Sequence, residues 1–474
     1  MLDLFEKGVG FANTWLSYAL VILLAIAGVW FTLRLKGVQI RLIGEQFRSI
    51  KEKPMNGKGM SSFQALMVST ASRVGTGNII GVSLALFVGG FGAVFWMWVM
   101  AIIGAASAFV ESTLAQIFKK RGKNGCYGGP AYYIEATLHC RPLAIAFSVI
   151  LILTYGFGFN MLASYNLQKT FSSYSFYNKL TVGEFPWAAL LIGLVVAILV
   201  GYCLFGGGRR IAQVTGVMVP VMGAIYILVA LVIVILNIGA LPSVFGKIFS
   251  NAFDFKAIFG GFSGSCIMYG IKRGVFSNEA GVGSAPNASA SAEVAHPVKQ
   301  GLVQVLSVFL DTLLVCSATA FMCMCSGVDP ASVADETAYV QASLSATLGD
   351  FGPIFLTVAM ILFAFTTLLG NLYYVEQCLA HICKGTPSKS VRYTSYVISC
   401  LVIVLGAVLS SSLLWGIADV TMAGMALINI PVILFLGRYA FRALKDYEKQ
   451  RKEGKDPVFY AQSIDLPYDT DYWK

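Results

Sequence analysis

Charged residues are scarce in this chain of 474 residues. Only 12% of them are Asp, Glu, Lys or Arg, whereas 57% are hydrophobic. Because soluble domains carry roughly 25% charged residues, burial in a water-soluble core cannot account for this composition. The mean hydropathy of +0.73 is typical of a protein that crosses a membrane many times.

Clustered histidines and cysteine pairs are also lacking. The three histidines are scattered, and the ten cysteines form no CxxC pair, the closest approach being "CMC" at Cys323–Cys325. Zinc sites and disulfide frameworks are therefore not predicted. An intramembrane enzyme would need a cluster of catalytic side chains, so the scatter argues against one. The formal net charge of +10 does not predict a nucleic-acid partner here, because in a membrane protein the placement of charge matters more than its sum.

Long apolar runs are abundant. Runs of the length needed to cross ~30 Å of hydrocarbon lie near residues 15–33, 62–88, 93–118, 143–168, 187–206, 211–238, 257–290, 300–325, 353–382, 393–411 and 413–437. The sequence thus predicts an all-α polytopic membrane protein with about eleven spans, of which 257–290 is interrupted. We divide it into an N-terminal helix and basic cytoplasmic linker (1–60), a core of ten helices (61–437) and a partly disordered cytoplasmic tail (438–474).

The distribution of basic residues predicts the orientation. Lys and Arg follow the first, third, fifth, ninth and last runs, whereas the loop 326–352 holds four acids and no Lys or Arg. By the positive-inside rule, the N-terminus lies outside and the C-terminus lies in the cytoplasm. The expected location is the cell (inner) membrane, with the lipid bilayer as a partner.

The run 62–88 contains "VGTGNIIG", which is unusually polar for the middle of a span. One hypothesis is a discontinuous helix, whose freed amides at Thr76, Gly77 and Asn78 face an anionic group. Freed carbonyls of Ala71 and Val74 would then suit a small hard cation. The alternatives are close helix packing through small residues and a dinucleotide-type glycine loop, which would need a preceding strand.

A second polar interruption, "YGIKRGVFSNEAGVGSAPN", occupies residues 269–287. Counting 62–88 as the first core helix makes this the sixth. That spacing is the one a five-plus-five inverted repeat requires, with the first span lying outside the repeat.

These stretches resemble the alanine or glycine:cation symporter family, also called the sodium:alanine symporters. The matching motifs include "VGTGNIIGV", "YGGPAYYIE", "RGVFSNEAGVGSAP", "HPVKQGLV" and "FAFTTLLGNLYYVE", and they cover most of residues 60–430. The resemblance implies a leucine-transporter (LeuT-type) 5+5 fold with one additional N-terminal helix. It also implies import of a small neutral amino acid coupled to Na⁺.

The same resemblance implies a set of site residues. Substrate would meet the first broken helix at Gly75, Thr76, Gly77 and Asn78, and the unwound sixth at Gly274, Phe276, Ser277 and Asn278. Na⁺ would be held by carbonyls of Ala71 and Val74 with Phe363, Thr366 and Thr367, whose i, i+3, i+4 spacing places them on one helix face. A simpler interpretation is that the threonines only hydrogen-bond to their own helix.

Two departures from the family pattern bear on substrate choice. Asn371 stands where the family commonly has tryptophan, and "NMLA" at Asn160–Ala163 replaces a motif that often ends in glutamine. If Asn371 and Ala163 line the pocket, alanine or glycine remains the first expectation, with glutamine or serine possible.

The sequence is also compatible with three related functions. Protons could replace Na⁺ as the coupling ion, carried by Glu279 or Asp311, and the same scaffold could serve a non-transporting amino-acid sensor or a channel. A gate in which Arg73 or Arg273 pairs with an acid such as Asp419 is a further hypothesis, because lone charges within a membrane are costly.

Overall fold

A computed structural model describes residues 2–54, 59–122, 125–182, 185–261 and 264–473. The helices up to the first long loop are α1 (Leu2–Arg34), α2 (Val38–Arg41), α3 (Ile43–Ile50), α4 (Ser62–Arg73), α5 (Val82–Gly89), α6 (Ala93–Ile117), α7 (Pro130–Leu138), α8 (Arg141–Leu151), α9 (Phe159–Lys169) and α10 (Ser175–Lys179). They are followed by α11 (Trp187–Leu204), α12 (Gly207–Leu236), α13 (Leu241–Ala252), α14 (Phe255–Gly260), α15 (Cys266–Asn278), α16 (Pro286–Ser289), α17 (Pro297–Val308), α18 (Ser317–Cys325), α19 (Glu336–Leu348), α20 (Phe351–Ile382), α21 (Lys389–Val408) and α22 (Ser411–Lys452).

The described part of the chain is mostly helical, and it also contains two small hairpins, which the sequence did not predict. Strand β1 (Lys120–Gly122) pairs with β2 (Gly125–Tyr127), and β3 (Thr181–Val182) pairs with β4 (Phe185–Pro186), both antiparallel. Wide π-type turns occupy η1 (Gly77–Gly81), η2 (Ile152–Gly158) and η6 (Phe309–Cys316). Short 3₁₀ turns occupy η3 (Thr170–Ser173), η4 (Ile238–Ala240), η7 (Pro330–Ser332) and η8 (Ala461–Ile464).

Nine helices of the described part of the chain are long and apolar enough to cross a membrane, and a bent pair makes up to ten. The bent pair is Ser62–Arg73 with Gly77–Gly89, which meet at 52°, so an interrupted span over 62–88 is confirmed. The seventh predicted run, 257–290, holds no single helix of this length in the described part of the chain, as its predicted interruption implies. Its main helix, α15, has 13 residues, or about 20 Å at 1.5 Å per residue, and a polar loop follows it.

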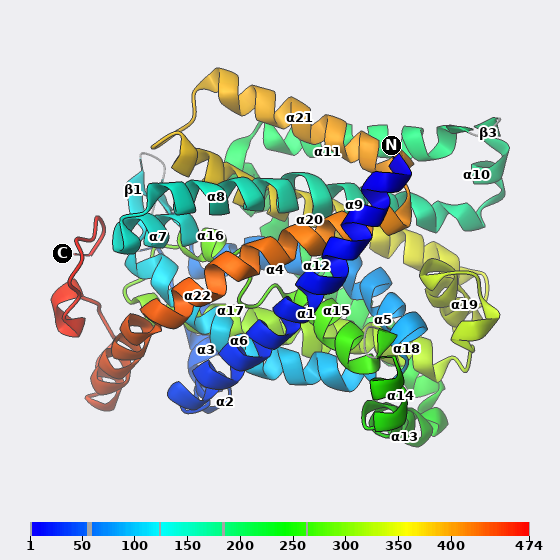
Figure 1. The fold of residues 1–474 in the computed structure, drawn as a ribbon, viewed down its shortest axis with the longest axis horizontal. Helices are drawn as coiled ribbons and strands as arrows, with labels where there is room; N and C mark the ends of the chain where they lie inside the picture. The colour runs from blue at the N-terminus through cyan, green and yellow to red at the C-terminus, as the bar shows by residue number, and fades with distance from the viewer. Residues whose placement is uncertain (1, 55–58, 123–124, 183–184, 262–263, 474) are drawn as a thin grey trace.

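The two interrupted helices are enclosed by the long ones. Helix α4 packs against α12 and α20, while α15 packs against α6, which also contacts α17. Helices α1 and α22 cross in front of this core, and α11 lies beside α21 along one edge (Figure 1). The first helix therefore packs on the outside of the core.

The start of α4 is closed by a specific cap. Ser61 accepts from the Gln64 amide while the Gln64 side chain accepts from the Ser61 amide, which forms a capping box that satisfies two helix-end donors. Just before it, Met60 forms a parallel bridge with Ala292. Met60 packs there with Ala65, Ala292 and Val294 in a small apolar cluster. The residues just before α4 and those just after α16 are therefore in contact.

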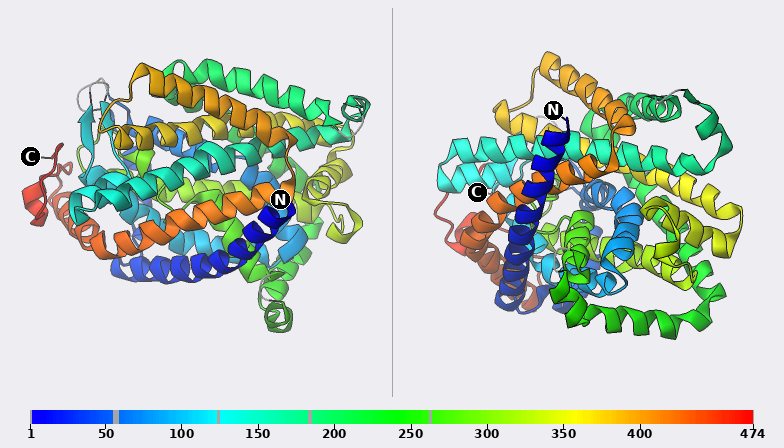
Figure 2. Two further views of the ribbon diagram at one scale, coloured as in Figure 1. Left: turned by 45° about the horizontal axis from the view of Figure 1, so that its top comes forward. Right: turned by 45° about the vertical axis from the view of Figure 1, so that its right-hand side comes forward.

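The expectation of a partly disordered tail is wrong. Helix α22 continues to Lys452, and the residues after it turn back toward the body (Figure 2). The Trp473 indole donates to the Gln116 carbonyl at 2.8 Å, and the Phe459 amide donates to the Ala295 carbonyl at 3.0 Å. Lys119 lies 3.9 Å from the centroid of the Tyr472 ring. The tail is polar in composition, but its few aromatic residues supply enough apolar area to dock it.

Removing one tail anchor should release the tail. Trp473 is only 6% exposed, and truncating a buried aromatic costs about 3–5 kcal/mol. We expect Trp473→Ala to make the segment after Lys452 sensitive to added protease. Tyr460→Ala is the matched control, because Tyr460 is 57% exposed. Equal protease resistance in the two variants would contradict the docked position of the tail.

Candidate functional site

The first core helix breaks at Val74, which leaves the helical region at φ −77° and ψ 87°. Beyond it, the Gly75 amide donates to the Asn78 side chain at 2.7 Å, and the Asn78 amide donates to the Gly75 carbonyl at 3.1 Å. In a continuous helix these two amides would donate to the carbonyls of Ala71 and Val74. The break therefore removes the α-helical partners of the two carbonyls that the sequence predicts as cation ligands.

Asn78 holds the break in shape. Its side-chain amide donates to the Asp311 carboxylate at 2.6 Å, while its side-chain oxygen accepts from Gly75. Since its backbone amide is also used, only Thr76 and Gly77 remain of the three amides that the sequence predicts to face an anion. The Thr76 hydroxyl accepts from Asn166 at 3.3 Å.

Thr367 of helix α20 lies in close contact with this break. A Cβ atom added to Gly75 would lie 1.9 Å from the Thr367 hydroxyl oxygen, so only glycine fits there. The Thr367 hydroxyl is buried and has no hydrogen-bond partner among the described residues. Thr366 hydrogen-bonds to its own helix, as the simpler interpretation expects, since it donates to the carbonyls of Leu362 and Phe363 at 3.0 and 3.1 Å. Thr367 is therefore the hydroxyl available to a ligand.

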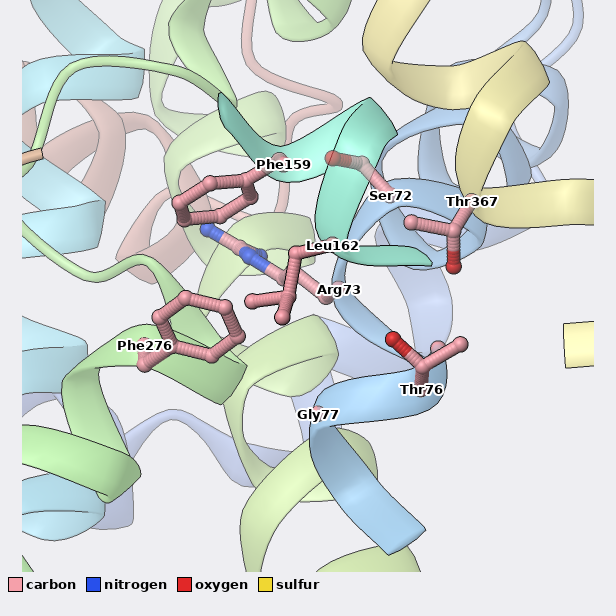
Figure 3. Close-up of a pocket in the computed structure, with 9 residues that line it drawn as sticks. Ser72, Arg73, Thr76, Gly77, Phe159, Leu162, Phe276 and Thr367 are labelled. Carbon is pink, nitrogen blue, oxygen red and sulfur yellow. The ribbon is translucent and has the colours of Figure 1, made fainter. Parts of the chain in front are cut away.

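A small cavity lies beside the break, with a volume of about 20 Å³. Its lining residues are Ser72, Arg73, Gly75, Thr76, Gly77, Phe159, Leu162, Phe276 and Thr367. In Figure 3 the two phenylalanine rings, Leu162 and Arg73 gather on one side, and Thr76 and Thr367 lie on the other. A volume of this size holds about one water molecule. The surrounding side chains must therefore move apart before an amino acid fits.

Aromatic rings close this cavity on its apolar side. The Phe276 ring lies 4.5 Å from Phe159 and 5.0 Å from Trp415, measured between centroids. Phe276 was predicted, whereas Phe159, Leu162, Trp415 and Ser72 were missed. The one available signal was that Phe159 and Leu162 flank or belong to the "NMLA" motif, which drew attention only to Ala163.

Six predicted substrate residues are not among those that line the cavity: Asn78, Ala163, Gly274, Ser277, Asn278 and Asn371. Asn371 lies directly behind Ser72, which donates to it at 2.6 Å, and it donates onward to Asn160 at 2.9 Å. Gly274 serves packing instead, because a Cβ there would lie 3.3 Å from Met97. Ala163 is buried within α9.

The second interruption begins later than expected. Residues 274–278 remain helical, and the chain leaves the helix at Glu279, which adopts φ +54°. Gly281 and Gly283 follow at φ +83° and +93°, a region that glycine enters without steric cost. Asn429 donates to the Gly281 carbonyl at 2.9 Å. The irregular loop 279–285, rather than residues 274–278, is therefore the unwound part.

Three buried carboxylates surround the two breaks. Asp311 accepts from Ser277 and Thr312 at 2.9 and 2.8 Å, in addition to Asn78. Glu279 accepts from Ser72 and Ser284, and Glu111 accepts from the Gly281 amide and Asn429. Within the described residues none of the three forms a salt bridge. Their hydrogen bonds tie η6 to η1 and α15, α4 to the residue that ends α15, and α6 to the following loop and to α22.

The hypothesis of a charge pair beside the cavity is resolved in favour of Arg273. Its guanidinium lies 2.6 Å from Asp419 and 4.4 Å from the centroid of the Trp415 ring. Arg73 instead donates to the Gln304 side chain at 2.9 Å. The pair therefore packs against the aromatic side of the cavity and joins α15 to α22.

Comparison with known proteins agrees with this geometry. The model of the sodium:alanine symporter family matches residues 2–461. The amino-acid carrier protein AlsT of Bacillus subtilis is 43% identical over 97% of this chain and 95% of its own length. The probable sodium/glutamine symporter GlnT of the same organism is 42% identical over 98% of this chain and 95% of its own length. The putative sodium/proton-dependent alanine carrier protein YrbD of Bacillus subtilis is 38% identical over 98% of this chain and 96% of its own length.

These relatives cover nearly the whole chain, and each is named as a carrier or a symporter. Their match, the family model and the interrupted apolar helices agree that the protein is a multi-pass membrane transporter and not an enzyme. The chain belongs to the sodium:alanine symporter family.

Proposed function

We propose that the protein is a sodium-coupled symporter that imports a small neutral amino acid, alanine or glycine in the first place, by alternating access. The observation that carries this proposal is the contact between Thr367 and the broken helix at Gly75. It places a hydroxyl that has no hydrogen-bond partner among the described residues against Gly75, which follows Val74 in the chain, and the break leaves the carbonyls of Ala71 and Val74 without their α-helical partners. Neutral oxygens of this kind are the ligands that a small hard cation prefers.

Such a cation would couple two parts of the molecule. Ala71 and Val74 belong to the first core helix and its break. Thr367, the preceding Thr366, and Phe363 one turn before them belong to α20. An ion bound between them stabilises the arrangement in which the break faces the cavity. Substrate that binds only this arrangement binds more tightly when Na⁺ is present, and the reverse holds by linkage.

The cavity supports a small substrate with an apolar side chain. The amides of Thr76 and Gly77 begin a helix, and helix N-termini favour a carboxylate. Phe159, Leu162 and Phe276 form the opposite wall. Ser277, Asn278 and Asn371 act from behind this wall through Asp311, Thr312 and Ser72.

We further propose the LeuT-type 5+5 arrangement, with the N-terminus outside and the C-terminus in the cytoplasm of the cell membrane. The division into 1–60, 61–437 and 438–474 belongs to the same proposal. Two interrupted helices, α4 with α5 and α15 with α16, occupy the first and sixth core positions. Helices α11 and α21, the fourth and ninth, pack on each other, as a repeat allows.

Two variants of this function have specific support. Glutamine is an alternative substrate, because the relative GlnT is named a probable sodium/glutamine symporter. Proton coupling is an alternative because Asp311 and Glu279 are buried carboxylates at the two breaks, and YrbD is named sodium/proton-dependent.

Thr367 variants test the ion site. Thr367→Val keeps the shape and removes the hydroxyl, so we expect the Na⁺ concentration for half-maximal alanine uptake to rise about tenfold or more, which corresponds to about 1.4 kcal/mol or more. Thr367→Ser should stay close to wild type. Thr421→Val is the matched control, because the Thr421 hydroxyl donates to carbonyls of its own helix, those of Ile417 and Ala418. An unchanged Na⁺ dependence in Thr367→Val would refute this ion site.

A further inference from the structure

A second, larger cavity of about 340 Å³ lies between the first helix and α15. Asn13, Thr14 and Ser17 of α1 line it on one side, and Tyr269 and Lys272 of α15 line it on the other. In the proposed orientation these residues lie in the outer half of α1 and in the outer half and middle of α15. The cavity therefore opens on the side from which substrate arrives.

Lys272 is the only charged side chain that lines this cavity in the described part of the chain. Its ammonium lies 2.8 Å from an Asp419 oxygen and 2.9 Å from the Asn13 side-chain oxygen. The same Asp419 oxygen also accepts from Arg273. Two cations thus share one carboxylate, which leaves one positive charge in excess.

This excess charge faces the cavity. The Lys272 side chain is 12% exposed, whereas Arg273 and Asp419 are each 2% exposed. The acid Glu6, farther along α1, accepts from Ser412 and not from Lys272. A positive charge that is partly removed from water attracts a carboxylate strongly, because screening there is weak.

The outer cavity is linked to the inner one through adjacent residues. Arg273 follows Lys272 in the chain, and its guanidinium lies 5.2 Å from the centroid of the Phe276 ring. Phe276 lines the inner cavity. A solute bound at Lys272 is therefore separated from the inner cavity by the Arg273–Asp419 pair and one layer of rings.

We propose that the outer cavity is an entry site, in which the carboxylate of an incoming amino acid pairs with Lys272 before the amino acid passes the Arg273–Asp419 pair. The carboxylate competes with Asp419 for Lys272 and supplies the missing negative charge. Asn13 accepts from the Lys272 ammonium and holds it in position. The first helix, which lies outside the proposed repeat, thereby has a role in uptake. The inference rests on the proposed import function and orientation.

Uptake kinetics give the first test. In Lys272→Met we expect the KM for alanine to rise about tenfold with Vmax within about twofold of wild type, because entry is slowed at low substrate while the inner site is intact. Lys272→Arg should keep the KM within about threefold, since it keeps the charge. Lys247→Met is the control, because Lys247 is an exposed lysine on α13. A loss of Vmax at unchanged KM, or no change at all, would overturn the entry site.

Labelling of the cavity itself gives the second test and does not depend on transport. Thr14→Cys in intact cells should react with a membrane-impermeant maleimide, because Thr14 is exposed on the cavity wall. Alanine, and propionate as a carboxylate without an ammonium group, should slow this reaction, and adding Lys272→Met should abolish the protection. Protection that survives Lys272→Met, or protection by chloride alone, would overturn the proposal. Failure of wild-type uptake with protection intact would instead contradict only the import function.

Discussion

Gly75→Ala is expected to lower sodium-driven alanine uptake by about a hundredfold or more, the size of effect that a displacement of about 1 Å produces in a site that depends on alignment. The added methyl carbon would lie 1.9 Å from the Thr367 hydroxyl. Helix α20 and the break must then separate, which moves the hydroxyl away from the Ala71 and Val74 carbonyls. Initial rates of uptake in proteoliposomes measure this loss.

Gly81→Ala is the matched control for this variant. It lies in the same broken helix, but its added carbon would lie 3.6 Å from the Trp415 ring, an ordinary van der Waals contact. We expect Gly81→Ala to keep uptake within about threefold of wild type, as most substitutions without a clash do. If Gly75→Ala transported as well as Gly81→Ala, the close approach of α20 to the break would not matter for transport.

Asp419→Asn is expected to produce the second large effect, on stability and on uptake together. It leaves Lys272 and Arg273 without their shared counter-charge in a buried position, and breaking a buried ion pair costs about 3–5 kcal/mol. We expect a clearly lower melting temperature in detergent and an uptake rate reduced about tenfold or more, because the α15–α22 contact above the cavity is lost.

Two comparisons separate charge from shape at this position. Asp350→Asn removes an exposed acid and should change neither the melting temperature nor uptake. The double variant Lys272→Met/Asp419→Asn removes one cation as well, so it should regain part of the lost stability. A wild-type melting temperature in Asp419→Asn would show that the cluster is not an essential contact between α15 and α22.

Local sequence patterns were enough to predict the long helices and the first break. Helices α6, α12 and α20 correspond to uninterrupted apolar runs, and Gly75 and Gly77 in mid-span predicted an irregular backbone. The run 257–290 was predicted as interrupted, but hydropathy, which averages over position, did not locate the interruption. Hydropathy alone could not show that the chain leaves the helix at Glu279. Hydrogen bonds from the loop after it to Asn429 and Glu111 hold that loop.

The site was predicted where it depends on the backbone and missed where it depends on packing. Gly75, Thr76 and Gly77 line the cavity because their own conformation creates it. Phe159 and Leu162 line it because α9 packs against the break, and no periodicity in the sequence gives that contact. The docked tail has the same origin, since the Gln116 carbonyl that accepts from Trp473 lies 357 residues away in the chain.

The most direct test of sodium-coupled import is the uptake of radiolabelled alanine into proteoliposomes under an inward Na⁺ gradient. The same measurement is repeated with an inward H⁺ gradient without Na⁺, and with no gradient. We expect accumulation above the external concentration only with the Na⁺ gradient, and its collapse when the gradient is dissipated. Equilibration without accumulation would indicate a channel, binding without uptake would indicate a sensor, and accumulation driven by H⁺ alone would contradict the sodium site at Thr367.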